Sequence, residues 1–254
     1  MSVLVVIPAR YASTRFPGKP LAMLGGQSII GWVWNAASHV ACVDRVVVAT
    51  DDERIYTHVN QLAGKEAAMM TSPDHNSGTD RCGEVQKRLA DKGELYDIVI
   101  NLQGDEPFVQ ASQIKSLVDS IESGKADIAT LRTPIGSSEE LFSPNNVKVV
   151  CDNFGKALYF SRQPIPYCRG IEPEKWIDKT AYYKHVGVYA FRSAVLADLC
   201  CLQHSVLEES ESLEQLRWLA AGYSIAVCDT EHANIGIDTP DDLAAAERYL
   251  AEIK

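Results

Sequence analysis

The sequence contains no long hydrophobic run. None of its 254 residues belongs to a stretch near the roughly 18 to 20 apolar residues that cross a bilayer. The apolar start at residues 3–7 is too short for the core of a secretory signal peptide, has no basic residue ahead of it and is soon followed by Arg10. We therefore expect no membrane partner and interpret residues 3–7 as a first strand.

Basic residues are also scarce. Lys and Arg number 24 against 34 Asp and Glu, which gives a formal net charge of −10 at pH 7. So acidic a chain is a poor match for a protein whose whole surface grips nucleic acid or anionic lipid. We expect no nucleic-acid partner, although a local basic pocket is compatible with this balance.

Several familiar motifs are missing. The seven cysteines are an odd number without a Cys-x-x-Cys pair, which predicts free thiols in a reducing cytoplasm. Neither the P-loop pattern Gly-x-x-x-x-Gly-Lys-Ser/Thr nor the dinucleotide pattern Gly-x-Gly-x-x-Gly occurs, which weighs against P-loop kinases, GTPases and NAD dehydrogenases. His-Glu-x-x-His and Gly-x-Ser-x-Gly are absent too, so zinc hydrolysis and triad acyl transfer have no support.

What the chain does contain is an alternation of short β-branched runs with helical patterns. In the first half we expect strands at residues 3–7, 45–50, 96–102 and 127–131, and helices over residues 29–37, 52–63 and 114–121. Apolar runs without strict alternation are typical of strands covered on both faces. This order predicts an α/β fold with a mostly parallel sheet flanked by helices and joined by right-handed crossovers.

The second half has a different texture. Short strands are expected at residues 147–150, 158–160, 185–191 and 223–228, with a helix over 213–220 that Gly222 ends. Thr239 and Pro240 fit the N-cap and first position of a last helix. We expect a single domain over residues 1–254, with a smaller mixed region at about 133–212 inserted or appended.

The most informative segment follows the first strand. Arg10, Arg15 and Lys19 lie within ten residues, in a loop that leaves the carboxyl end of a buried strand. Open α/β sheets bind ligands at that edge, and three cations there can meet several phosphate oxygens. A polyphosphate site is the favoured interpretation, and a solvated basic loop is the alternative.

Acidic residues follow another strand. Asp105 and Glu106 place hard oxygens where Mg²⁺ could bridge to phosphates, and Gln103 could bind a ligand or the loop backbone. A polar turn that caps the next helix is the alternative. Asp238 is by itself better explained as a turn residue, and it matters only if folding brings it to Asp105.

Ser77 and Gly78 precede a helix whose N-terminus could hold a ligand edge, and an ordinary capped start explains them nearly as well.

Polar residues in the second half carry weaker signals. Arg162 follows a strand and could pair with a carboxylate bidentately. His185 and Tyr189 are four apart on an expected strand, so they face the same side. Glu214 and Gln215 also stand beside apolar runs. Taken alone, each of these residues is better explained by a structural role.

Nine segments, in order from about residue 3 to residue 245, closely resemble the 3-deoxy-D-manno-octulosonate (Kdo) cytidylyltransferase family: IPARYASTRFPGKPL, VATDDERI, HNSGTDR, NLQGDEPF, NNVKVV, ALYFSR, KHVGVYAFR, SLEQLRWL and GIDTPDDL. The stretch 163–183 does not match. The resemblance implies a nucleotide-diphospho-sugar transferase-like, Rossmann-like α/β fold, a smaller substrate and dimerisation region, a cytoplasmic homodimer and Mg²⁺ dependence. The implied nucleotidyltransferase activity converts CTP and Kdo to CMP-Kdo and pyrophosphate for lipopolysaccharide biosynthesis.

The resemblance also implies roles for particular residues. The implied catalytic residues are Lys19, Arg10 and Asp105, and the implied metal ligands are Asp105 and Asp238. The implied nucleotide contacts are Pro8, Ala9, Arg10, Arg15, Lys19, Ser77, Gly78 and Gln103. The implied sugar contacts are Gln103, Arg162, His185, Tyr189, Glu214 and Gln215. The alternatives are a cytidylyltransferase for 8-amino-Kdo or sialic acid, a sensor that binds CTP without turnover, and a glycosyltransferase, for which no convincing Asp-x-Asp motif is present.

Overall fold

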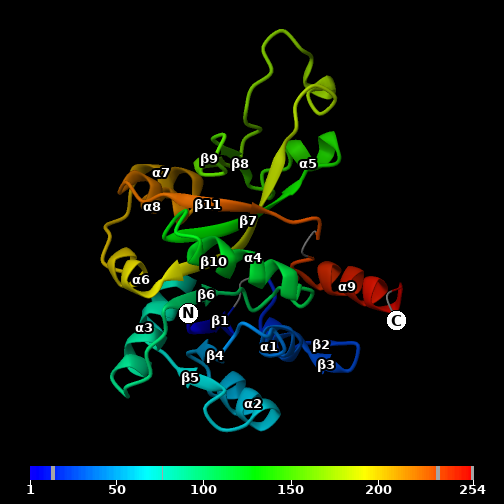
Figure 1. Ribbon diagram of the computed structural model, residues 1–254. Helices are drawn as coiled ribbons and strands as arrows, with labels where there is room; N and C mark the ends of the chain where they lie inside the picture. Colours follow the sequence, from blue (N-terminus) through cyan, green and yellow to red (C-terminus); the bar gives the residue numbers. More distant parts are fainter. Residues whose placement is uncertain (13–14, 76, 233–234, 253–254) are drawn as a thin grey trace. The chain divides into compact units, whose positions relative to one another are not determined.

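The computed structural model describes residues 1–12, 15–75, 77–232 and 235–252 (Figure 1). The chain divides into two compact units. The first comprises Met1–Val118 and Asn234–Lys254, and the second comprises Asp119–Ala233. The smaller region expected at about 133–212 lies inside the second unit. Helix α4 (Ala111–Glu122) contains the point at which the first unit gives way to the second.

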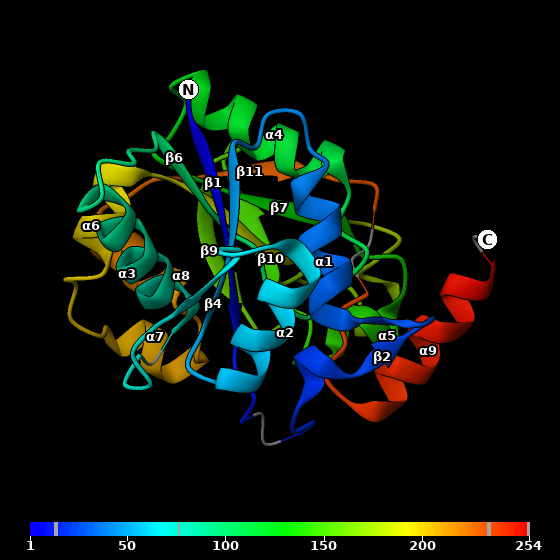
Figure 2. The same cartoon turned by 90° about the horizontal axis from the view of Figure 1, so that it is seen from below.

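The first unit is built on parallel strands in the order β6 (Ile98–Asn101), β1 (Val3–Ala9), β4 (Arg45–Thr50) and β5 (Ala68–Met70). The predicted strands at 3–7 and 45–50 are confirmed, and residues 3–7 are fully buried. Helices α1 (Ile29–Ser38) and α2 (Glu53–Ala63) lie on one side of β1 and β4, and α3 (Gly78–Ala90) lies on the other (Figure 2). This is the parallel, helix-covered sheet that the alternating pattern predicts.

Within the first unit, the C-terminal helix packs against a short hairpin that follows the first strand. The 3-10 helix η1 (Lys19–Leu21) leads into the hairpin of β2 (Met23–Leu24) and β3 (Gln27–Ser28). Leu24, Ile237 and Leu250 share a buried cluster that packs helix α9 (Pro240–Glu252) against this hairpin. The predicted cap is confirmed, since Thr239 Oγ1 accepts a hydrogen bond from the Asp242 backbone N–H at 3.2 Å. The segment around residue 238 is thereby fixed near the start of the chain.

The second unit is mixed, as expected for the later half. Strand β7 (Ile128–Pro134) pairs in parallel with β11 (Ile225–Asp229) and antiparallel with β10 (Tyr183–Arg192). Strand β8 (Lys148–Cys151) pairs antiparallel with β10 and with β9 (Ala157–Ser161). The remaining elements are α5 (Ser138–Phe142), η2 (Pro173–Lys175), α6 (Ser193–Leu199), α7 (Val206–Glu211) and α8 (Gln215–Ala220).

A buried charge fixes the position of α3. Arg81 has no exposed surface, and its guanidinium donates to Asp51 Oδ2 at 2.6 Å and to Thr71 Oγ1 at 2.7 Å. Both partners follow the ends of parallel strands, so the arginine ties α3 to the carboxyl edge of the sheet. A buried charge is tolerated only when it is paired and hydrogen-bonded, as this one is.

Two further observations concern the described residues. Across the described ranges, no helix has the length and apolar character needed to cross a membrane. The seven cysteines are free thiols, as the lack of a Cys-x-x-Cys pair predicts.

Candidate functional site

The loop after β1 folds back on itself. The Gly18 backbone N–H donates to the Tyr11 carbonyl at 2.9 Å, and Gly18 has φ of 72°. A Cβ at this position would lie 3.1 Å from the Tyr11 ring, so both the left-handed backbone and the close approach favour glycine. The turn delivers Lys19, the next residue, to the first unit's two candidate metal ligands.

Lys19 lies between two carboxylates. Its Nζ donates to Asp105 Oδ2 at 2.6 Å and to Asp238 Oδ1 at 3.1 Å, and its side chain is only 11% exposed. The Ile237 backbone N–H also donates to the Asp105 carbonyl at 3.0 Å, so the two acidic segments are joined through their main chains. Folding therefore brings Asp238 to Asp105, which is the condition that the sequence left open.

The ion pairs keep Lys19 charged. Burial alone would lower the pKa of Lys19, but its attraction to Asp105 and Asp238 outweighs burial and raises that pKa above its ordinary value. Arg15 reaches the same cluster, with Nη2 3.0 Å from Asp238 Oδ2. Two of the three predicted cations thus gather at the paired carboxylates.

Arg10 takes a different direction. Its Nη2 donates to the carbonyl of His75, in the loop that precedes α3. Glu84 of α3 holds that loop, because its Oε2 hydrogen-bonds the His75 ring at 2.5 Å and accepts from the Ser72 N–H at 2.9 Å. Burial alone would raise the pKa of Glu84, but these hydrogen bonds lower it. Sequence patterns do not single out Glu84, because its partners come together only on folding.

The predicted nucleotide contacts meet at the carboxyl end of β1. Pro8 is the second-to-last residue of that strand, and Ala9 is its last residue. A Cβ at Gly104 would lie 2.8 Å from the Pro8 carbonyl oxygen, so only glycine fits beside it. Gly78 begins α3 next to Pro8. Gly104 and Gly78 therefore allow the turn after β6 and the start of α3 to pack closely against the end of β1.

Two predicted polar side chains beside them already have partners. Ser77 is the N-cap of α3, and its Oγ accepts from the Asp80 N–H at 3.1 Å. Gln103 Nε2 donates to Asn101 Oδ1 at 3.2 Å. Asn101 was missed from the sequence, although a polar residue at the end of an otherwise apolar buried strand is a signal that could have identified it.

In the second unit, His185 and Tyr189 do face the same side of β10. Their ring centroids are 5.3 Å apart, and His185 Nε2 is 2.9 Å from Thr130 Oγ1. His185 keeps a little exposed surface, yet Phe160 and Tyr189 enclose its ring. That burial lowers the pKa of His185 from 6.5 to about 3, so the ring is neutral at pH 7.

The Tyr189 hydroxyl is buried and makes no well-formed hydrogen bond to a described residue, although the Thr130 side chain interacts with it. Burial and the negative charge of Glu214 raise the pKa of Tyr189 well above its ordinary value. Buried polar groups are almost always hydrogen-bonded, so an orphaned hydroxyl indicates a partner supplied by water or a ligand. Gln215, the buried first residue of α8, follows Glu214 directly.

Arg162 is occupied by the main chain. Its Nε donates to the Glu211 carbonyl at 2.7 Å, Nη1 to the Pro144 carbonyl at 3.1 Å and Nη2 to the Ser212 carbonyl at 3.3 Å. The guanidinium therefore fastens the end of α7 in place. Its expected contact with a sugar carboxylate stays a prediction, which the two remaining N–H groups leave open.

The carboxyl edge of this parallel sheet holds a cationic loop, closely packed glycines and paired carboxylates. This combination is typical of α/β proteins that bind phosphorylated ligands at that edge of the sheet. The comparisons with known proteins specify it further. Residues 4–225 match the family model described as cytidylyltransferase. This chain belongs to the cytidylyltransferase family.

Individual relatives and solved structures agree. A Porphyromonas gingivalis protein named 3-deoxy-manno-octulosonate cytidylyltransferase is 49% identical over 98% of this chain and 96% of its own length. A Phocaeicola vulgatus protein of the same name is 48% identical over 99% and 98%. The solved structure of CMP:2-keto-3-deoxy-manno-octonic acid synthetase complexed with CTP is 41% identical, covers 100% of both chains and has a TM-score of 0.90. The predicted nucleotidyltransferase-like α/β fold and the family resemblance are confirmed.

The neutral state of His185 predicts a pH-dependent stability. The folded pKa lies below the unfolded value, so the stabilisation is complete above pH 6.5 and is lost as pH falls toward about 3. Between pH 7 and pH 5 this group should cost about 2 kcal/mol of unfolding free energy. Urea unfolding of the unmodified chain and of His185→Gln at both pH values isolates the effect. Equal pH dependence in the two proteins would contradict the prediction.

Proposed function

We propose that this chain transfers CMP from CTP to Kdo, which yields CMP-Kdo and pyrophosphate. The relatives that are 48% and 49% identical over nearly their whole length carry the name of that activity, and the 41% identical structure is named as a CTP complex. The observation in this chain that carries the proposal is Lys19, held at the two carboxylates of Asp105 and Asp238. A cation in that position suits a substrate whose reacting part is a triphosphate.

The cations of the first unit account for substrate binding. Lys19, Arg10 and Arg15 offset the charge of the triphosphate and of the departing pyrophosphate, which is where the transition state accumulates negative charge. The backbone near Pro8, Ala9 and Gly78 would contact the cytidine, along with Ser77 and Gln103. We assign the sugar contacts to Gln103, Arg162, His185, Tyr189, Glu214 and Gln215.

Mg²⁺ fits the paired carboxylates. Asp105 and Asp238 both bond to one ammonium, so their oxygens lie within reach of a single cation. In the described part of the chain no group of three or more His, Cys, Asp or Glu residues is arranged as a metal site. Mg²⁺ is commonly bound through one or two carboxylates together with substrate phosphates, which this set allows. Bound there, Mg²⁺ would offset phosphate charge and lower the pKa of the attacking sugar hydroxyl.

The chain's own residues then orient the reaction. No side chain has to act as the base for the sugar hydroxyl in this scheme. His185 is neutral and hydrogen-bonded to Thr130, so it can position a hydroxyl but carries no charge of its own. The Tyr189 hydroxyl, which has no well-formed hydrogen bond to a described residue, can donate to a sugar oxygen.

The direct test is pyrophosphate release, measured with CTP, UTP, ATP or GTP in combination with Kdo, 8-amino-Kdo or sialic acid, at fixed Mg²⁺. We expect turnover to require CTP and Kdo together. If turnover is faster with another sugar acid than with Kdo, that sugar acid is the substrate and the assignment of Kdo is wrong. Tight CTP binding with no pyrophosphate release from any pair would contradict the proposed enzymatic activity. The protein would then be a nucleotide sensor.

The two-carboxylate metal site predicts a defined mutant pattern. Asp105→Ala and Asp238→Ala should each lower turnover at limiting Mg²⁺ by at least about a hundredfold, because each removes an oxygen ligand from developing charge. Asp241→Ala is the matched control, since Asp241 is an exposed acid on the first turn of α9. Near-normal turnover in either Asp105→Ala or Asp238→Ala, with the melting temperature unchanged, would rule out the site.

A homodimer is the assembly that we infer. Large apolar side chains of the second unit are strongly exposed, among them Phe154 (87%), Val206 (78%), Tyr167 (73%) and Leu158 (62%). Leu158 also lines a largely apolar cavity of about 550 Å³ together with Pro166. A large exposed apolar surface beside an apolar cavity is typical of a protein interface. The lipopolysaccharide pathway and the cytoplasmic location stay predictions based on the family resemblance.

Sedimentation velocity checks the assembly. The unmodified chain should sediment as a dimer, and Leu158→Glu should shift it toward monomer because a buried carboxylate would have no partner across the interface. Leu95→Glu, a matched change at an exposed leucine of the first unit, should leave the dimer intact. A monomeric unmodified chain, or equal effects of the two changes, would refute this interface.

A further inference from the structure

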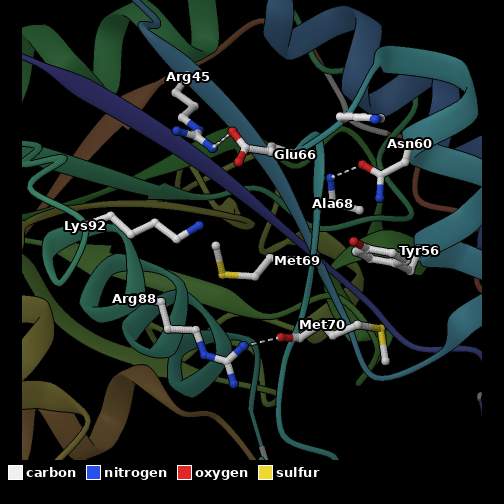
Figure 3. Close-up of a pocket in the computed structure, with 10 residues that line it drawn as sticks. Arg45, Tyr56, Asn60, Glu66, Ala68, Met69, Met70, Arg88 and Lys92 are labelled. Carbon is white, nitrogen blue, oxygen red and sulfur yellow. Dashed lines mark hydrogen bonds and ion pairs between the residues drawn. The ribbon is translucent and has the colours of Figure 1, made fainter.

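The first unit holds a second cavity that none of the predicted site residues lines. It has a volume of about 480 Å³ and lies along β5, with walls that include Arg45, Tyr56, Lys65, Met69, Arg88 and Lys92 (Figure 3). Small-molecule sites typically measure about 300 to 1,000 Å³. The cavity is therefore large enough for a metabolite with one or two functional groups.

Its charge is opposite to that of the chain. Four cations line the cavity against one carboxylate, that of Glu66, whereas the whole sequence has a net charge of −10. Arg45 pairs with Glu94 and Arg88 pairs with Glu84. The side-chain ammonium groups of Lys65 and Lys92 have no hydrogen bond or ion pair to any described residue. Two uncompensated ammonium groups beside two guanidinium groups attract an anion.

The strand edge in this cavity is closed to another strand. β5 ends the order of the sheet, yet Asn60 Oδ1 accepts from the Ala68 N–H at 3.1 Å and Arg88 Nη1 donates to the Met70 carbonyl at 2.7 Å. Peptides that add to a sheet need those backbone groups free. The edge contacts thus argue against a peptide and in favour of a compact ligand.

The walls differ in chemistry from side to side. In Figure 3, Arg88 and Lys92 reach in from one side, Tyr56 faces them from the other, and Met69 lies between. A tyrosine ring and a thioether provide an apolar surface for a planar or hydrocarbon group. The ligand that satisfies both sides carries a phosphate at one end and an apolar or aromatic group at the other.

The single carboxylate is held in an unusual backbone conformation. Glu66 has φ of 74°, a left-handed value that is rare for residues other than glycine, and its Oε2 lies 3.7 Å from Arg45 Nη2. Strained residues of this kind cluster at ligand-binding positions. The Glu66 carboxylate covers Arg45 in place of an anion, so an incoming ligand competes with it.

We propose that this cavity binds a small phosphate monoester with an apolar or aromatic group, at a place separate from the residues assigned to CTP and the sugar. The proposal does not depend on the activity proposed above. Phosphate monoesters occur both as free metabolites and as the headgroup of phosphatidic acid. The limited volume of the cavity and the covered strand edge favour the free metabolite.

Methionine methyl NMR provides a local test with phenyl phosphate as the probe. The sequence contains four methionines, of which Met69 and Met70 line the cavity and Met1 and Met23 do not. In protein labelled with ¹³C at methionine methyl groups, phenyl phosphate should shift the Met69 and Met70 signals saturably and leave the other two in place. Inorganic phosphate should bind more weakly, because it cannot contact Tyr56. An absence of saturable shifts, or equal affinity for both probes, overturns the proposal.

Charge variants locate the anion. The double variant Lys65→Gln with Lys92→Gln should raise the Kd for phenyl phosphate by about tenfold, and Glu66→Gln should lower it. Lys87→Gln is the matched control, since Lys87 is exposed on α3 next to Arg88 but does not line the cavity. Equal effects of Lys87→Gln and the double variant would refute the site. Sedimentation with phosphatidic acid vesicles that is lost in the double variant would assign the cavity to a lipid headgroup and refute a free ligand.

Discussion

The arrangement of the first unit depends on one shared ammonium. Lys19 bonds to Asp105 and Asp238, which come from a strand-end turn and from the start of the last helix. Without that cation the two carboxylates would repel each other at close range. The lysine thus holds together a loop, a turn and a helix start that are distant in sequence.

Local rules predicted the parts of the fold that carry long or strongly patterned signals. The apolar runs located β1 and β4, and the pair Thr239 and Pro240 located the start of α9. The strands β2, β3 and β5 escaped, because runs of two or three residues cannot display a period, and the seven-residue helix α6 was not predicted either. The strand pairing within the second unit was equally out of reach, since it depends on contacts far apart in the chain.

The candidate site divides along the same line. Residue type and position after a strand were enough to single out Lys19 and Asp105, while the meeting of Asp105 with Asp238 required the fold. The partners of Arg162 could not be inferred, because a guanidinium that follows a strand fits a sugar carboxylate and main-chain carbonyls equally well. Glu84 could not be predicted for a related reason. Its partners His75 and Ser72 come together only when the preceding loop has folded onto α3.

The contact between Arg88 and the Met70 carbonyl also bears on self-association of the molecule. An outer strand with bare backbone groups invites sheet-to-sheet association between copies. Here a side chain from α3 covers one such group and Asn60 covers another. A change of the Arg88 side-chain rotamer that breaks this contact would expose the Met70 carbonyl at the strand edge. The conformation of Arg88 therefore affects both the protection of the edge and the binding of an anion in the neighbouring cavity.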